Sequence, residues 1–208
     1  MSLFITFEGG EGSGKSVQAK ALYRRLSKLK VPVLLTHEPG GTPFGRRIGR
    51  WLKWAKDTDI SPLTELMLFN ASRAQLVSEV VKPALKSGKT VISDRFDDST
   101  TVYQGYGRGL DLAMVKAVNK AATQGLTPDL TVLLDAPVET CFARKGTEKR
   151  DRFEQEAKSF HRKVREGYLK LTEGESGRWL VVDASQPKAE TAEIIWQRVS
   201  QLLSGQGG

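Results

Sequence analysis

Short, unbroken apolar runs recur along the chain and predict buried β-strands. Each is rich in leucine or β-branched residues, and none alternates regularly with polar residues. Continuous runs of this kind are typical of strands that are covered on both faces. The five predicted strands are LFITFE (3–8), VPVLLTH (31–37), TVISD (90–94), LTVLLD (130–135) and WLVVD (179–183).

The segments between these runs carry apolar residues at helical spacing. Phe153, Phe160 and Val164, for example, belong to one apolar stripe. Ser61 before Pro62 is a good helix start, because the hydroxyl can cap the helix and proline suits the first turn. The predicted helices cover residues 15–30, 43–53, 61–86, 111–124, 153–172 and 187–203.

Alternating strands and helices predict an α/β fold with three layers, α/β/α, in which a five-stranded parallel sheet lies between helices. Ligands of such sheets collect beyond the carboxyl ends of the strands. Acidic residues that end these runs include Glu8, Asp94 and Asp135. We therefore expect much of the chemistry in the segments that follow these strand ends and the end of the second strand.

Composition narrows the class of protein without naming it. The 208 residues, 39% of them hydrophobic, suffice for a single domain over 1–208. The lone cysteine, Cys141, excludes a disulfide framework and a cysteine-based metal site. Without a long apolar run or a leader pattern, a cytoplasmic protein is expected. The net charge of +8 suits nucleic acid, acidic membranes or small phosphorylated ligands as partners. The chain has no block of five like charges, which argues against a nucleic-acid-binding tail.

A glycine-rich stretch behind the first strand predicts a phosphate-binding loop. FEGGEGSGKS (7–16) contains the pattern G-x-x-x-x-G-K-[ST], with a strand before it and a helix after it. Glycines let successive N–H groups point at phosphates, and the helix N-terminus adds positive charge. We expect Lys15 to reach the outer phosphates and Ser16 to bind Mg²⁺. The predicted ATP-binding residues are Gly9, Gly10, Glu11, Gly12, Ser13, Gly14, Lys15 and Ser16.

A second informative stretch, SDRFDDSTTVYQGYGRG (93–109), follows the third strand. Asp94 ends that strand, so its carboxylate can lie beside the loop and hold Mg²⁺ through water. The Arg95 guanidinium can bind a phosphate with two hydrogen bonds. Hydroxyls, an aromatic ring and an amide follow at Ser99, Thr100, Tyr103 and Gln104. An ordinary polar loop after a strand is the alternative interpretation.

Taken together, these motifs resemble those of bacterial thymidylate kinases. The resemblance is carried by FEGGEGSGKS, EPGGTPFG (38–45), LFNASRAQ (68–75), DRF..S...YQGYGRG and DRFEQE (151–156), and it covers nearly the whole chain. It implies a P-loop nucleoside monophosphate kinase, usually a homodimer, that transfers the γ-phosphoryl group of ATP to dTMP with Mg²⁺. The implied partners are ATP, dTMP and a second copy of the chain, and neither nucleic acid nor a membrane.

The resemblance also implies roles in the acceptor pocket. Phe69 and Arg73 lie four residues apart on one predicted helix face. The family uses this phenylalanine to stack on thymine and this arginine to hydrogen-bond a ring carbonyl. Arg95 is implied to hold the dTMP phosphate, Tyr103 to lie against the deoxyribose, and Glu38 to help order the pocket. The other implied contacts to the base are Ser99, Thr100 and Gln104.

The basic run RKGTEKRDR (144–152) resembles the lid of these kinases, expected over about 143–153. Such a run is usually a solvated face, but beside a phosphate-binding loop it predicts a flap that closes over ATP and supplies arginines. Glu11 is acidic where eukaryotic-type enzymes have an arginine nearby, so the resemblance is to the bacterial class, whose lid provides the catalytic arginine. The implied catalytic group is Arg152 first, then Arg150 and Arg144, together with Lys15, Arg95 and Glu11.

Several positions depart from the family pattern. His37 stands where an arginine is expected before EPGG, and Gly49 stands where another is expected, with Arg50 beside it. One contact to the nucleotide is therefore in question, unless Arg50 replaces it. Phe96 in place of a tyrosine removes one hydroxyl. The lid is also about one residue shorter than the pattern.

Other functions stay open on the sequence alone. A P-loop ATPase that binds nucleic acid would explain the positive charge, but it needs neither an acceptor site nor a lid. A catalytically silent paralogue used for assembly would tolerate Gly49. The nearest enzyme alternative is a kinase for another nucleotide or nucleoside. Phe69, Arg73 and Gln104 argue against a purine acceptor, which needs a larger, differently lined pocket.

Overall fold

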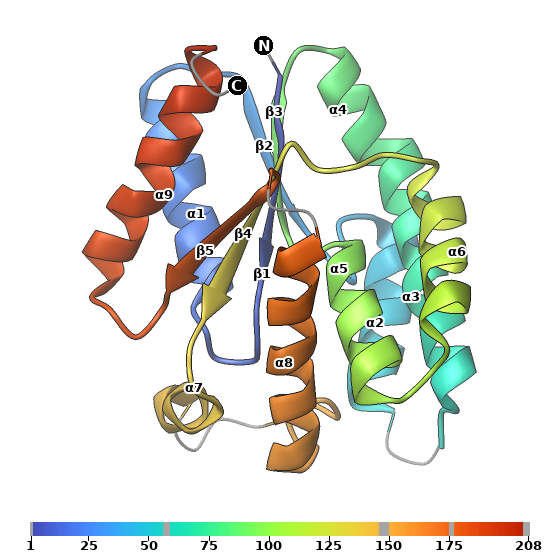
Figure 1. The fold of residues 1–208 in the computed structure, drawn as a ribbon. Helices are drawn as coiled ribbons and strands as arrows, with labels where there is room; N and C mark the ends of the chain where they lie inside the picture. The colour runs from blue at the N-terminus through green and yellow to red at the C-terminus, as the bar shows by residue number, and fades with distance from the viewer. Residues whose placement is uncertain (1, 56–58, 146–149, 175–176, 206–208) are drawn as a thin grey trace.

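One parallel sheet forms the centre of the molecule. The computed structural model describes residues 2–55, 59–145, 150–174 and 177–205 (Figure 1). The strands are β1 (Phe4–Glu8), β2 (Val33–His37), β3 (Thr90–Asp94), β4 (Leu130–Asp135) and β5 (Trp179–Asp183). Their order is β2-β3-β1-β4-β5, and every neighbouring pair is parallel. The predicted five-stranded parallel sheet is confirmed, and β1 at its centre aims the loop after Glu8 at the middle of the carboxyl edge.

Helices cover both faces of this sheet, as the three-layer prediction requires. They are α1 (Lys15–Lys28), α2 (Pro43–Trp54), α3 (Pro62–Leu76), η1 (Val77–Val81), α4 (Lys82–Lys86), α5 (Asp97–Thr100), η2 (Thr101–Gly107), α6 (Leu112–Thr123), α7 (Val138–Lys145), α8 (Lys158–Gly174) and α9 (Lys188–Leu203). In Figure 1, α1 and α9 lie together on one side of the sheet, and α2, α3, α4 and α6 lie on the other.

Side chains of β1 explain how the two layers are held. Ile5 and Phe7 are fully buried and pack in one cluster with residues of α1 and α9. Phe4 points the other way and packs with Leu76 and Val81 of the long helical segment. Because successive strand residues face opposite sides, a continuous apolar run supplies both layers at once.

The segment 61–86 is helical over nearly its whole length, as predicted. The Ser61 hydroxyl accepts a hydrogen bond from the Thr64 N–H at 3.2 Å and so caps α3. The helix then runs through η1, a π-helical stretch, into α4. This irregular turn comes just before Pro83, which has no N–H to donate to the helix.

Three local expectations were wrong or incomplete. Residues 97–107, interpreted as a polar loop or a substrate-binding segment, form a helix of α5 and η2. Residues 138–145, for which no helix was predicted, form α7. The predicted helix 153–172 begins only at Lys158, because residues 152–155 form turns. Residues 97–107 are polar and contain glycines, so their sequence lacks the apolar spacing that predicts a helix.

Across the residues that the structure describes, no helix has the length and apolar character needed to cross a lipid bilayer.

Candidate active site

The glycine-rich loop lies between β1 and α1, at the centre of the carboxyl edge of the sheet. Gly14 has φ +97° and stands at the N-terminus of α1. Gly12 has φ +76°, and a Cβ atom there would lie 2.4 Å from the carbonyl oxygen of Cys141. The loop is therefore packed directly onto the backbone of α7, and only glycine fits at position 12.

Lys15 is buried over this loop. Its Nζ donates to the carbonyl oxygens of Gly10 at 2.7 Å and Gly9 at 3.1 Å. Burial lowers the Lys15 pKa to about 8, with Arg95 adding to the effect and Glu11 opposing it. An ammonium held by neutral carbonyls in a buried site is ready to exchange them for phosphate oxygens.

Ser16 and Asp94, both expected at a metal site, are brought together. The Ser16 hydroxyl donates to the Asp94 carboxylate. Oxygen atoms of this kind are the ligands that Mg²⁺ prefers, and one or two protein ligands beside phosphates and water are usual for it. Among the described residues no group of three or more His, Cys, Asp or Glu side chains could hold a metal. The donor set therefore fits a cation that arrives with a phosphate ligand.

A large cavity opens over the loop. Its volume is about 720 Å³, and its walls include Lys15, Ser16, Asp94 and Arg144. A second cavity of about 560 Å³ adjoins the loop between Gly12 and the segment 184–188, and Arg144 lines it as well. Each of the two cavities is in the size range of small-molecule sites.

The arginines of the basic run lie in three different places. Arg144 lines both cavities beside the loop. The Arg150 guanidinium lies over the Phe142 ring, 5.3 Å from its centroid. Arg152, the first choice for the catalytic arginine, donates to the Glu65 carboxylate at 2.6 Å, away from the loop. Of these three arginines, Arg144 is the one that lines the cavities beside the loop. Residues 146–149 of the predicted lid lie outside the described residues.

Arg95 is held at the end of β3 in a left-handed backbone conformation, φ +73°. Its guanidinium donates to the hydroxyls of Ser99 at 3.1 Å and Tyr103 at 3.2 Å, and it forms an ion pair with Glu11. Burial alone would lower the Arg95 pKa, but Glu11 and the neighbouring hydroxyls raise it above its ordinary value. Positive φ at a non-glycine residue is typical of functional sites.

Glu8 holds two of the hydroxyl groups that also contact Arg95, those of Ser99 and Tyr168. Its carboxylate is fully buried and accepts hydrogen bonds from the Ser99 hydroxyl at 2.6 Å, the Tyr168 hydroxyl at 2.8 Å and the Phe96 N–H at 2.8 Å. Burial raises the Glu8 pKa to about 7, with Asp98 adding and Arg95 opposing. Tyr168 comes from α8, and nothing in the sequence around it indicated a contact with Glu8.

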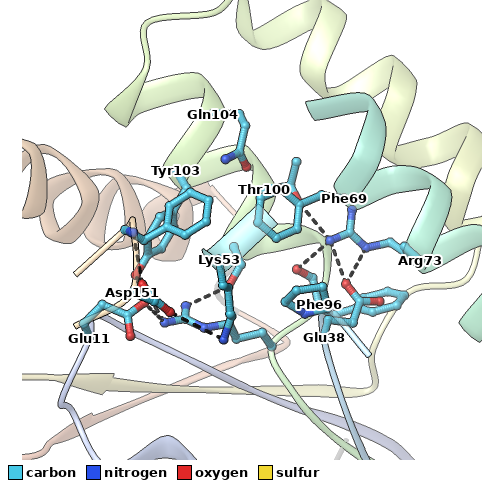
Figure 2. Close-up of a pocket in the computed structure, with 14 residues that line it drawn as sticks. Glu11, Glu38, Lys53, Phe69, Arg73, Phe96, Thr100, Tyr103, Gln104 and Asp151 are labelled. Atoms are coloured by element: carbon cyan, nitrogen blue, oxygen red, sulfur yellow. Dashed lines mark hydrogen bonds and ion pairs between the residues drawn. The ribbon is translucent and has the colours of Figure 1, made fainter. Parts of the chain in front are cut away.

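The predicted acceptor residues gather around one small cavity (Figure 2). All of those predicted line it: Glu38, Phe69, Arg73, Arg95, Ser99, Thr100, Tyr103 and Gln104. Its volume is about 40 Å³, room for roughly three water molecules. The Phe153 ring lies 5.6 Å from the Phe69 ring and occupies the space beside it. A cavity of this volume is too small for a pyrimidine ring, so its walls, which include Phe69 and Phe153, have to move apart before a base can enter.

Arg73 is almost completely buried beside this cavity. Its nitrogens donate to the Glu38 carboxylate at 2.9 Å, the Thr100 hydroxyl at 2.8 Å and the side-chain amide oxygen of Asn119 at 3.1 Å. They also donate to the Asn70 side-chain oxygen and to the backbone carbonyl of Phe96. A ring carbonyl would have to share one of these donors. Arg73 thus also holds α3 to α5 and α6.

Glu38 offers an acceptor that the described protein groups leave unused. One carboxylate oxygen receives Arg73, but Oε1 is buried and has no hydrogen-bond partner among the residues described. Burial raises the Glu38 pKa, with Arg73 opposing. A buried acceptor of this kind at the wall of a cavity fits a donor group on a ligand.

Gln104 is placed by Glu65, a residue that sequence reasoning missed. The Gln104 amide donates to Glu65 at 2.6 Å, and Arg108 and Arg152 contact the same fully buried carboxylate. Nothing in the sequence separates Glu65 from an ordinary solvated carboxylate near a helix start. Its partners come from segments 39 to 87 residues away.

One departure from the family pattern, Gly49, has a structural explanation. Gly49 is buried against Pro39, where a Cβ atom would lie 3.0 Å from the Pro39 carbonyl oxygen. Arg50 is exposed and lines neither the loop cavity nor the acceptor cavity. Lys53, not singled out in the sequence, lines both. Arg50 therefore lies outside both cavities in this structure, and its replacement of the missing arginine gains no support from the cavity walls.

Comparison with known proteins decides the family. A sequence model described as "Thymidylate kinase" matches residues 7–195. The chain belongs to the thymidylate kinase family. It is therefore an enzyme that transfers the γ-phosphoryl group of ATP to dTMP, giving dTDP and ADP on the route to dTTP.

Relatives of the thymidylate kinase family match over almost their full length. The chain is 57% identical over 203 residues to a thymidylate kinase of Dehalococcoides mccartyi (strain CBDB1), with 98% of each chain covered. It is 48% identical over 211 residues to that of Geotalea uraniireducens (strain Rf4), with 98% of this chain and 99% of the relative covered. The crystal structure of the Ehrlichia chaffeensis enzyme is similar with a TM-score of 0.77 and 32% identity, over 95% of this chain and 98% of that one.

Proposed function

We propose that ATP binds in the cavity over the glycine-rich loop and dTMP in the cavity beside Phe69, and that the phosphoryl group crosses where the two cavities meet. The observation that carries this proposal is a shared wall. Four residues line both cavities: Glu11, Glu38, Lys53 and Arg95. An acceptor held on one side of this wall has its phosphate next to the outer phosphates on the other side, as in-line transfer requires.

On the donor side, the loop N–H groups, Lys15 and the N-terminus of α1 bind the phosphates. Lys15 moves from the carbonyl oxygens of Gly9 and Gly10 to phosphate oxygens. Arg144 reaches the nucleotide from α7 and is the lid arginine whose place supports a catalytic role. We assign the cavity beside residues 184–188 to the adenine end of ATP.

On the acceptor side, thymine stacks on Phe69 after Phe153 withdraws, and Gln104 and Thr100 contact its edge. Arg95 holds the dTMP phosphate from β3, a role supported by its hydroxyl partners and its ion pair with Glu11. The Tyr103 ring lies against the sugar. The buried Oε1 of Glu38 accepts a hydrogen bond from a donor group on the nucleotide.

Mg²⁺ is part of the proposal. Ser16 and Asp94 would hold it, directly or through water, and when bound it would neutralise charge on the outer phosphates. The observation behind this assignment is the contact between the Ser16 hydroxyl and the Asp94 carboxylate at the mouth of the loop.

The decisive experiment offers each nucleoside monophosphate separately with ATP and Mg²⁺ and measures ADP formation. We expect activity with dTMP well above that with dUMP, dCMP, AMP or GMP. Phe69→Ala should raise the KM for dTMP by about tenfold or more, because base–aromatic stacking contributes ~1–3 kcal/mol. Hydrolysis of ATP that ignores every acceptor would contradict the proposal.

We propose further that the enzyme is a homodimer that uses the exposed face of α3. Leu63 and Met67 lie four residues apart on this helix and are 46% and 48% exposed. Large apolar side chains left in water at helical spacing favour an interface between copies. Sedimentation should show a dimer that Met67→Glu weakens, whereas a monomer at all concentrations would contradict it.

A cytoplasmic location completes the proposal. Its support is the chemistry of the substrates, which are cellular nucleotides, and the free, buried thiol of Cys141. Fluorescence of a fusion protein spread through the cell interior is the expected result.

A further inference from the structure

Lys53 stands in the last turn of α2, where it faces the junction of the two nucleotide cavities. It is one of the four residues that line both. Figure 2 shows its side chain between the Glu11 and Glu38 sides of the pocket. Two of these four residues are acidic, so Lys53 and Arg95 supply the positive charge of the shared wall.

The two cations are held very differently. The Arg95 side chain is only 15% exposed and donates to several oxygens around it. The Lys53 side chain is 41% exposed, and its Nζ lies 3.7 Å from the Asp151 carboxylate. That separation exceeds a hydrogen bond, so the ammonium can turn toward another anion at small cost.

We infer that Lys53 is a further catalytic residue, whose ammonium binds non-bridging oxygens of the phosphoryl group while it passes from ATP to dTMP. In this step the bond from the γ-phosphorus to the bridging oxygen of ADP breaks, and a bond to a dTMP phosphate oxygen forms. Lys53 donates hydrogen bonds and changes neither its protonation nor its covalent state. Its charge is most effective when negative charge spreads over the transferring group.

A purely structural role is the alternative, in which Lys53 anchors the segment around Asp151 to α2. The structure shows other anchors. The Arg152 N–H donates to the Lys53 carbonyl at 3.1 Å, and its Nε donates to the Leu52 carbonyl at 3.0 Å. Asp151 also accepts from the N–H groups of Phe153 and Glu154. None of these bonds uses the Lys53 ammonium.

Five variants separate the two roles. Lys53→Met removes the charge and keeps the length, and Lys53→Arg restores a cation. Asp151→Asn removes the ion pair while an amide oxygen still accepts the backbone N–H groups. Arg50→Met removes a positive charge three residues earlier on the exposed face of the same helix. Steady-state kcat and KM, thymidine binding and the melting temperature are measured for each, with Lys53→Gln as a second neutral variant.

Lys53→Met and Lys53→Gln should lower kcat by about tenfold to a hundredfold, with thymidine binding unchanged, because a charge near the transferring group acts mainly in the transition state. Lys53→Arg should recover most of this loss, and Arg50→Met and Asp151→Asn should stay within about threefold of the parent enzyme.

Two results would overturn the inference. One is an unchanged kcat in both neutral variants. The other is an equal loss in Asp151→Asn and Lys53→Met, which would assign Lys53 to the ion pair. The inference rests on the proposed placing of ATP and dTMP. If that placing is wrong, the parent enzyme will show no preference for dTMP among the nucleoside monophosphates, which is a result distinct from those of the Lys53 variants.

Discussion

At the scale of single residues, burial prepares Lys15 for its ligand. In the described structure its ammonium is satisfied only by loop oxygens, and its pKa is lowered to about 8. Phosphate oxygens bring negative charge within contact distance and favour the protonated form. ATP binding and protonation of Lys15 are therefore coupled.

This coupling predicts proton uptake when ATP binds above pH 8. At pH 8.5 a group with a pKa near 8 is mostly neutral, so binding should take up roughly 0.7 proton per ATP. Calorimetry in two buffers that differ in ionisation enthalpy measures the number directly. Lys15→Arg, which stays charged, should bind without this uptake. An equal uptake in that variant would assign the proton to another group.

At the scale of elements, a few buried charges position the helices around the acceptor cavity. Glu65 of α3 contacts Gln104 of η2, Arg108 directly after η2, and Arg152 of the segment before α8. Close backbone packing does the rest, since a Cβ atom at Gly107 would lie 2.6 Å from the Phe160 ring of α8. The cavity wall is therefore assembled from elements that meet only in the folded chain.

Glu65→Ala should accordingly destabilise the fold and loosen the acceptor site. Removing one partner of a buried charge network leaves the others unsatisfied and costs about 3 kcal/mol. The KM for dTMP should rise too, because the Gln104 amide loses its acceptor. Urea unfolding and steady-state kinetics measure the two effects. Glu79→Ala, at an exposed carboxylate, is the control, and equal unfolding midpoints for the two variants would refute the prediction.

Sequence patterns predicted the helices and strands better than they predicted the contacts between them. The continuous runs located all five strands, and the glycine-rich motif located the loop, because both depend on local composition. The destination of Arg152 depended on Glu65, 87 residues away. Phe153 looked like part of a helical stripe but lies in a turn and lines the acceptor cavity. Lys53 became visible only when the two cavities were seen to share a wall.

At the scale of the whole molecule, buried carboxyl groups link stability to pH. Burial raises the pKa of Glu8 to about 7 and that of Asp97 to about 8. The folded state thus keeps protons that the unfolded state loses near pH 4 to 5. A raised acid pKa stabilises the fold at low pH, and this stabilisation is lost as pH rises through the folded value. Burial lowers the His37 pKa below its ordinary value of 6.5. Below pH 6.5 this histidine therefore makes the fold less stable as the pH falls, which opposes the effect of the carboxyl groups.

The melting temperature should therefore fall between pH 6.5 and pH 8, where the histidine no longer contributes. The expected loss is on the order of 1–2 kcal/mol, which corresponds to several degrees in a chain of this size. Thermal unfolding across this range is the measurement. Glu8→Gln cannot titrate and should flatten the dependence, and a slope that the variant leaves unchanged would place the proton elsewhere.

The four residues shared by the two cavities carry two negative and two positive charges, so their wall is close to neutral before substrates arrive. A small inorganic anion that enters there meets carboxylates as well as cations and gains little from Coulomb attraction. A nucleotide adds the contacts of its base and sugar to those of its phosphate. We therefore expect this wall to discriminate against free phosphate and sulfate ions, so that millimolar concentrations of these ions inhibit the enzyme only weakly.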